Sequence, residues 1–150
     1  MFVQPSLKLF CVCGGVIVAD DGSVSIITLL ERIEMTTVGD DDANIIFAPL
    51  KWHTLSLWRR AADQSQQTFK VRTQVFAGGT LVENMTGYVD IDFADKQNFR
   101  INQPHFGFPI ARSGNNDFVI SILSEDGEWT ERGRYPIEVI CEPAKVTSTK

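Results

Sequence analysis

Residues 69–79 read "FKVRTQVFAGG", and residues 88–93 read "YVDIDF". In both stretches apolar and polar side chains alternate. The inward set is Phe69, Val71, Thr73, Val75, Val89, Ile91 and Phe93, and the outward set is Lys70, Arg72, Gln74, Tyr88, Asp90 and Asp92. Successive side chains of a strand point to opposite faces, so this period of two predicts half-buried strands. Gly78-Gly79 supplies the turn, and the segment predicts an antiparallel pair.

The same alternation recurs along the chain, whereas helical spacing is not sustained over three turns. Further extended segments are expected at 7–18, 24–34, 44–49, 52–60, 99–101, 106–111, 118–123 and 135–141. Turn residues separate them, at Asp20–Ser23 and Glu125–Glu128 among others. About eight to ten short strands with frequent turns predict an all-β fold. We expect a two-sheet antiparallel β-sandwich with Greek-key links.

Local details of this fold follow from the pattern. Gly14-Gly15 allows a bend, with Cys11 and Cys13 before it on the core face. Apolar residues on both faces up to Leu30 predict that 24–34 is one strand, central to its sheet. The segment 44–49 ends in a proline, which cannot donate to a ladder, so it is expected at an edge. Residues 61–67 are expected to form a polar turn.

Composition bounds the class of protein. The chain has 150 residues, 43% of them apolar and 22% charged, which predicts one domain over 1–150 with a flexible polar tail at 143–150. Its net charge of -5 disfavours nucleic acid and anionic membranes as partners. No apolar run approaches a membrane span of about 20 residues. The start lacks the features of a secretory signal and the cysteine count is odd, so we expect a soluble cytoplasmic protein.

Two groups of residues could hold a metal. Cys11 and Cys13 share a strand face, and with Cys141 and either His53 or His105 they would make a zinc set, although ordinary core cysteines are the alternative. Asp90, Asp92 and Asp95, with the acidic run 40–42, could supply oxygens to Ca²⁺. The alternation instead places Asp90 and Asp92 on a solvent face. We therefore predict no metal and no cofactor.

The aromatic strand 52–60 leaves two interpretations open. If Leu55 and Leu57 face the core, Trp52 and Trp58 stand on the opposite face, where a sugar or a protein could pack on them. Otherwise that face is covered as well.

The stretch 102–109, "NQPHFGFP", is either a lid or an exposed docking segment, with His105, Phe106 and Phe108 as its candidate contacts. His53 falls on the Leu55 face, and His105 has no Ser, Cys or Asp partner by spacing. No hydrolase motif occurs, so a non-enzymatic protein is expected.

Three further stretches carry a family resemblance: "VIVADDGSVSIITLLERIE" at 16–34 after the cysteine strand, "FKVRTQVFAGGTLVEN" at 69–84 and "GRYPIEVICE" at 133–142. With them the chain resembles an uncharacterised group of small bacterial and phage proteins, a domain of unknown function. The resemblance spans most of the chain and implies a C2-like or immunoglobulin-like sandwich without assigned activity or cofactor. Gly14-Gly15 replaces an acidic residue that often follows the cysteine in that group.

The expected function is a binding or assembly module for a protein partner or a second copy. Its candidate surfaces are the loop 39–43, the Trp52 and Trp58 strand, and the stretch 102–109. The alternatives are small-ligand or carbohydrate binding on the tryptophan face and a Ca²⁺-dependent C2-like module.

Overall fold

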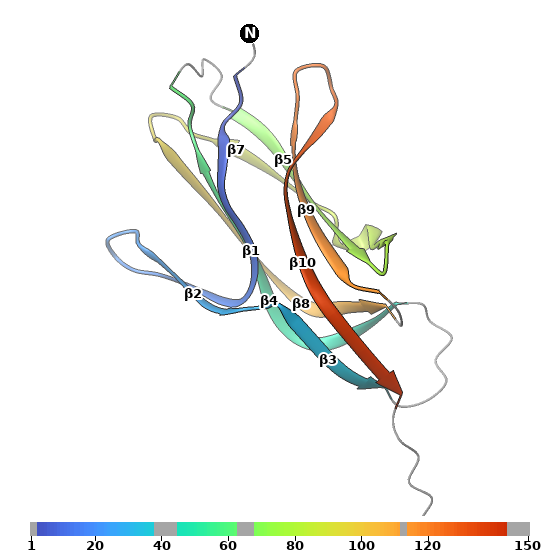
Figure 1. Ribbon diagram of the computed structural model, residues 1–150. Helices are drawn as coiled ribbons and strands as arrows, with labels where there is room; N and C mark the ends of the chain where they lie inside the picture. The colour runs from blue at the N-terminus through green and yellow to red at the C-terminus, as the bar shows by residue number, and fades with distance from the viewer. Residues whose placement is uncertain (1–2, 38–44, 63–67, 112–113, 144–150) are drawn as a thin grey trace, which may run out of the picture.

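A computed structural model describes residues 3–37, 45–62, 68–111 and 114–143 (Figure 1). These residues form ten strands and one short 3₁₀ helix, η1 (Glu83–Met85). The strands are β1 (Ser6–Val18), β2 (Val24–Leu29), β3 (Arg32–Thr37), β4 (Ile45–Arg59), β5 (Thr68–Ala77), β6 (Thr80–Leu81), β7 (Gly87–Asp92), β8 (Asn98–Ala111), β9 (Asn116–Leu123) and β10 (Trp129–Pro143). The predicted loop 39–43, positions 63–67 of the predicted turn and the tail from 144 onwards lie outside the described residues.

The strands form two packed sheets, which confirms the predicted all-β sandwich. One sheet has the order β2-β1-β4-β8, and the other has the order β3-β10-β9-β5-β6, with β7 also paired to β5. All pairs are antiparallel except β3 with β10, which run parallel. The prediction of a wholly antiparallel sandwich was therefore wrong at this one pair. The Greek-key links stay a prediction.

The hairpin around 69–93 forms as predicted. Val71 lies opposite Val89 and Arg72 opposite Tyr88 in the β5–β7 ladder. Gly78 and Gly79 both have positive φ, 57° and 84°, and they turn the chain into the short β6 before η1 leads to β7. Positive φ is cheap only for glycine, so this pair fixes the turn.

The segment 24–34 is not one central strand, as its apolar pattern predicted. It divides into β2, which is the edge of the four-stranded sheet, and β3, which joins β10 in the other sheet. Between them the Leu30 N–H donates to the Val12 carbonyl over 3.0 Å, and the Glu138 N–H donates to the Glu31 carbonyl over 3.0 Å. Apolar residues occupy both faces here because the chain changes sheet.

One further expectation about strands was confirmed and another was wrong. The described part of the segment 44–49 is an edge, because β4 runs from Ile45 to Arg59 but β1 pairs only with His53–Arg59, so 45–49 has β8 as its one ladder partner among the described residues. Pro49 is accommodated because the β4–β8 register shifts between Ala48 and Lys51, where regular ladder bonds are interrupted. Residues 99–101 and 106–111 are parts of one long strand, β8, rather than two. Its Pro104 is tolerated because β8 is an edge strand.

The space between the sheets holds two apolar clusters with a polar layer between them. One cluster surrounds Trp52, Phe108 and Phe118, and the other surrounds Trp58, Ile91 and Phe93. Thr54 and Ser56, 3% exposed each, separate the two tryptophans on the same face of β4. The Trp58 indole N–H donates to the Ser56 hydroxyl over 3.0 Å, which satisfies both groups.

Cys11 and Cys13 are buried, at 2% and 0% exposure, but not between the sheets. Val12, which alternates with them, belongs to the Trp52 cluster, and Phe10 packs against both clusters. The cysteines therefore lie on the opposite face of β1, the outer face of the four-stranded sheet. Their predicted orientation toward the core was wrong.

Candidate binding surface

Four of the five residues predicted to bind a ligand or partner lie inside the sandwich or at its polar layer. The Trp52 ring stacks on His105 with centroids 4.1 Å apart and meets Phe108 edge-on at 5.4 Å. Trp52, Trp58 and Phe108 have 0% exposure. The proposed sugar-binding face was therefore wrong: both tryptophans lie on the inner face of β4, which the second sheet covers. Phe106, one residue along β8, points outward and is 75% exposed.

His105 is a hydrogen-bonded group of the polar layer. Its Nε2 lies 3.2 Å from the Thr54 hydroxyl, which also lies 3.3 Å from Gln103 Oε1. Burial lowers the pKa of His105, and the nearby charge of His53 lowers it further. The Thr54 hydroxyl is enclosed, so this pair satisfies buried polar groups and offers no accessible nucleophile. His53, on the outer face, contacts Asn102 Oδ1 through Nδ1 at 3.0 Å.

The predicted metal-ligating residues are brought together only in part: Cys11 and Cys13 share a side-chain hydrogen bond, and Cys13 lies opposite His53 in the β1–β4 ladder. Asp90 and Asp92 point to solvent from β7, and Asp92 Oδ1 accepts the Ala94 N–H over 3.0 Å. In the described ranges, no group of three or more His, Cys, Asp or Glu residues is placed to hold a metal. Burial raises the pKa of Cys11 to about 11, so its thiol is protonated at neutral pH. The acidic run 40–42 lies outside the described residues.

Exposed apolar side chains gather, among the described residues, on the hairpin formed by the end of β1 and by β2. We call residues 16–29 the arm; it projects from the lower part of the sandwich in Figure 1. Among the described residues, four of the seven exposed large apolar side chains belong to it: Ile17 at 55%, Val18 at 45%, Ile27 at 45% and Leu29 at 51%. By the β1–β2 register, Ile17, Ile27 and Leu29 share one face of the hairpin and Val18 lies on the other. Exposed apolar side chains gathered in this way mark interaction surfaces in folded proteins.

The arm leaves the sandwich at a bend. Thr28 has a φ of 54°, a conformation that a β-branched residue rarely adopts. It lies against Gly14, because a Cβ built on Gly14 would be 3.5 Å from the Thr28 Cβ. A Cβ built on Gly15 would meet the Ile27 Cβ at 3.8 Å. The second strand of the hairpin therefore lies over the glycine pair at ordinary contact distance, and the irregular backbone of the arm is at Thr28.

The outer edge of β2 carries no charged residue and no proline to discourage pairing. It is an edge strand of the four-stranded sheet, and residues 23–30, "SVSIITLL", contain no charge and no proline. Edge strands normally carry lysine, proline or inward charges that discourage association. The other edge of the same sheet, β8, does contain Pro104 and Pro109.

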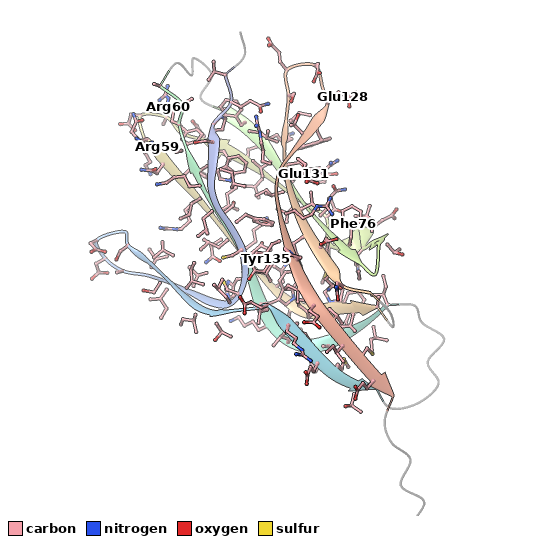
Figure 2. The ribbon with its side chains drawn as sticks, in the orientation of Figure 1. Arg59, Arg60, Phe76, Glu128, Glu131 and Tyr135 are labelled. Carbon is pink, nitrogen blue, oxygen red and sulfur yellow. The ribbon has the colours of Figure 1, made fainter. Side chains whose placement is uncertain are left out.

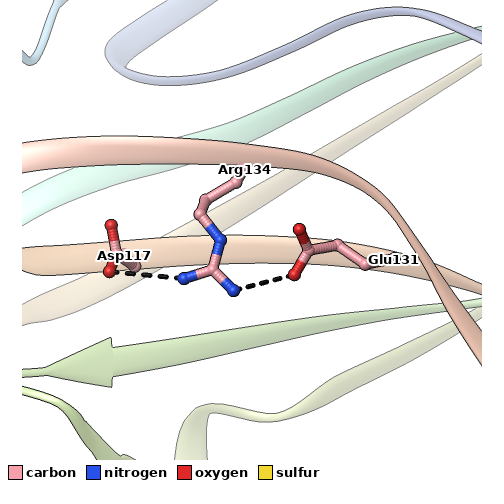
Figure 3. Close-up of polar contacts among 3 residues, drawn as sticks. All are labelled: Asp117, Glu131 and Arg134. Carbon is pink, nitrogen blue, oxygen red and sulfur yellow. Dashed lines mark hydrogen bonds and ion pairs between the residues drawn. The ribbon is translucent and has the colours of Figure 1, made fainter.

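A second exposed group lies on the outer face of the six-stranded sheet. The Arg72 guanidinium sits 4.6 Å from the centre of the Trp129 ring, and Tyr88, 60% exposed, lies 5.9 Å from that ring. Beside it Arg134 binds Glu131 at 2.8 Å and Asp117 at 3.4 Å (Figure 3). Alternation placed Arg72 and Tyr88 on this face, but nothing local in the sequence predicts their contact with Trp129, which begins β10.

Comparison with protein-family models gave no match, and comparison with curated proteins gave none either. The resemblance to a bacterial and phage group therefore stays a prediction. Within the described ranges, no helix is long and apolar enough to cross a membrane.

Proposed function

We propose that this protein is a non-enzymatic binding and assembly module that acts in the cytoplasm and associates with other protein chains through the arm. The observation that carries the proposal is the concentration of exposed Ile17, Val18, Ile27 and Leu29 on one projecting hairpin. Burying such side chains in a partner stabilises a complex by about 25 cal/mol per Å² of apolar surface. The three free cysteines, Cys11, Cys13 and Cys141, support a reducing compartment.

The partner that fits this surface best is a second copy of the chain. An edge strand offers unpaired backbone N–H and C=O groups, so two β2 strands can pair in antiparallel orientation and join their sheets. The uncharged run from Ser23 to Leu30 places no like charges opposite each other in any such register. A two-fold contact also uses each exposed side chain twice.

Light scattering after size exclusion, over a wide range of protein concentration, tests this proposal. The wild-type chain is expected to form a dimer at high concentration. Ile27→Ser should raise the dissociation constant of the dimer about tenfold or more, because both chains of the two-fold dimer carry the substitution and apolar contact is lost on both sides of the interface. The matched control is Phe106→Ser, which removes an even more exposed apolar side chain from the other edge strand of the sheet. It should leave the dimer intact.

Two results would contradict the proposal. A chain that stays monomeric at every concentration does not assemble through β2. Equal weakening by Ile27→Ser and Phe106→Ser would show general hydrophobic association rather than a defined interface.

A further inference from the structure

A cleft lies between the arm and the outer face of the four-stranded sheet. The turn of the arm reaches back to β8, where Arg100 Nη1 donates to the Gly22 carbonyl over 3.4 Å. The cleft beneath this contact has a volume of about 570 Å³. Its walls come from β1, the arm, β4, β8 and Lys96 in the connection before β8, so segments distant in the sequence build it. Volumes of this size are typical of small-molecule sites.

The cleft is basic although the chain as a whole is acidic. Lys8, Lys96 and Arg100 line it, and among the described residues that line it there is no aspartate or glutamate. None of these three cations forms an ion pair within the described residues. Figure 2 labels Arg59 and Arg60 at the same end of the molecule, where Arg59 lies opposite Asn98 in the β4–β8 ladder. Three cations without counter-charges around one cavity favour an anion.

The acid next to Gly22 in the arm is already engaged by its own turn. Asp21 precedes Gly22, but its Oδ1 accepts the Ser23 N–H over 2.9 Å and the Ser23 hydroxyl over 2.6 Å. These bonds lower the pKa of Asp21 and hold its carboxylate within the arm. Arg100 uses one donor on Gly22 and keeps the rest of its guanidinium fork available. Asn98 adds an amide to the lining.

From these observations we infer that the cleft binds a small organic phosphate. Arg100 is suited to phosphate oxygens through paired hydrogen bonds, and Lys8 and Lys96 supply point charges. Leu57 and Val24 offer apolar surface to the body of the ligand. A polyanion is disfavoured, because beyond the cleft it would meet a protein surface of net charge -5.

Isothermal titration calorimetry with phenyl phosphate at low salt tests the inference, with phenol and inorganic phosphate as comparison ligands. Phenyl phosphate is expected to bind the wild-type chain more tightly than inorganic phosphate, because only the former reaches Leu57 and Val24. Phenol should not bind. Affinity should fall as sodium chloride is added, as for any charge-dependent contact.

The variants Arg100→Gln and Lys96→Gln should each weaken binding about tenfold or more, the loss expected from one charge-assisted hydrogen bond. Both side chains are exposed, so the fold should be kept, and a melting curve checks this. The matched control is Lys70→Gln, which removes the same charge from an exposed position on β5 in the other sheet. It should bind like the wild type.

Four results would overturn the inference: no binding of phenyl phosphate, equal binding of phenol, equal binding of inorganic phosphate, or an equal loss in Lys70→Gln. The first two exclude an anion site, the third excludes an organic ligand, and the last shows only an effect of net charge. The inference does not depend on assembly through β2. Ile27→Ser should bind phenyl phosphate normally, because Ile27 is not part of the cleft lining.

Discussion

His105 shows how a single residue makes the stability of the protein depend on pH. It lies between the Trp52 ring and the Thr54 hydroxyl, and its pKa is lowered from 6.5, first by burial and then by His53. The unfolded chain therefore binds a proton more readily than the folded chain. Stability from the neutral imidazole is present in full above pH 6.5 and is lost as pH falls below it toward the folded pKa.

We therefore expect the free energy of unfolding to decrease between pH 7 and pH 5, and an NMR titration to place the pKa of His105 below 6.5. His53→Gln should raise the pKa of His105 because it removes the neighbouring charge. The pKa should nevertheless stay below 6.5, since burial is the larger cause. A titration at or above 6.5 in the wild-type chain would contradict the buried position of His105.

The cysteines give a second prediction at this scale. Cys11 and Cys13 are buried, and burial raises the pKa of both thiols, whereas Cys141 is partly exposed. Because the thiolate is the reactive form, a thiol reagent should modify Cys141 first and reach the other two only on unfolding. Mass spectrometry after brief treatment at pH 8 measures this order. Rapid labelling of Cys11 would show that the arm opens from the sheet.

Among single residues, burial of the tryptophans was the feature that the sequence left open. On β4 both alternating sets contain large apolar side chains, Trp52 and Trp58 in one and Leu55 and Leu57 in the other. Alternation separates the two sets but does not say which one faces the second sheet. The choice depends on Phe108 and Phe118, which are far away in the chain and pack against Trp52.

At the scale of elements, the passage of β1 beside β10 depends on a glycine. A Cβ built on Gly133 would lie 2.7 Å from Leu7 Cδ2 and 3.3 Å from Ile120 Cγ2. The Leu7 side chain can turn away, but Ile120 is 1% exposed and fixed in the core. Gly133 also lies at the shift in the β9–β10 register. A side chain at this position would push the two strands apart.

Gly133→Ala should therefore lower the free energy of unfolding by about 1–3 kcal/mol, the usual cost of overpacking. Urea denaturation measures the change. Gly15→Ala is the matched control, because its Cβ would meet only Ile27 at 3.8 Å and beyond, an ordinary contact. That variant should be neutral. Equal effects from the two variants would mean that β1 does not approach β10 this closely.

Element boundaries could be predicted where pattern and turn chemistry agree, as for β5, β7 and β9. They could not be predicted where tertiary contacts decide. The apolar run 24–34 looks continuous, but its division into β2 and β3 depends on the bonds from Leu30 to Val12 and from Glu138 to Glu31. Pro49 correctly indicated an edge by local rules, but they did not show that 45–49 continues into the half of β4 that pairs with β1.

For the whole molecule, the sandwich could be predicted because nearly every segment alternates with period two. The candidate surfaces could not, because each joins strands distant in the sequence. The cleft needs Lys8, Lys96 and Arg100 on one side of the sheet, and the exposed apolar side chains of the arm come from two different strands, β1 and β2. Their positions depend on how the arm leaves the sheet, a direction that is not encoded locally.

The combination of net charge and the exposed arm predicts how the whole protein behaves as pH changes. The isoelectric point is about 5.0, so charge repulsion between molecules vanishes near pH 5. The apolar arm then provides the contact through which molecules associate. We expect a solubility minimum near pH 5, measured as protein left in solution after centrifugation.

Replacing both Ile17 and Ile27 by serine should increase the amount of protein that stays in solution at this minimum, without changing the charge of the chain. Phe106→Ser, at the most exposed of the large apolar side chains among the described residues, is the matched control and should change it less, because Phe106 lies apart from the arm. Solubility is also measured at pH 8, where His105 is neutral in every variant and protonation of His105 does not destabilise the fold. A variant that is soluble at pH 8 and precipitates at pH 5 therefore associates near its isoelectric point. If the double variant and the control precipitate alike at pH 5, the arm is not the surface through which these molecules meet.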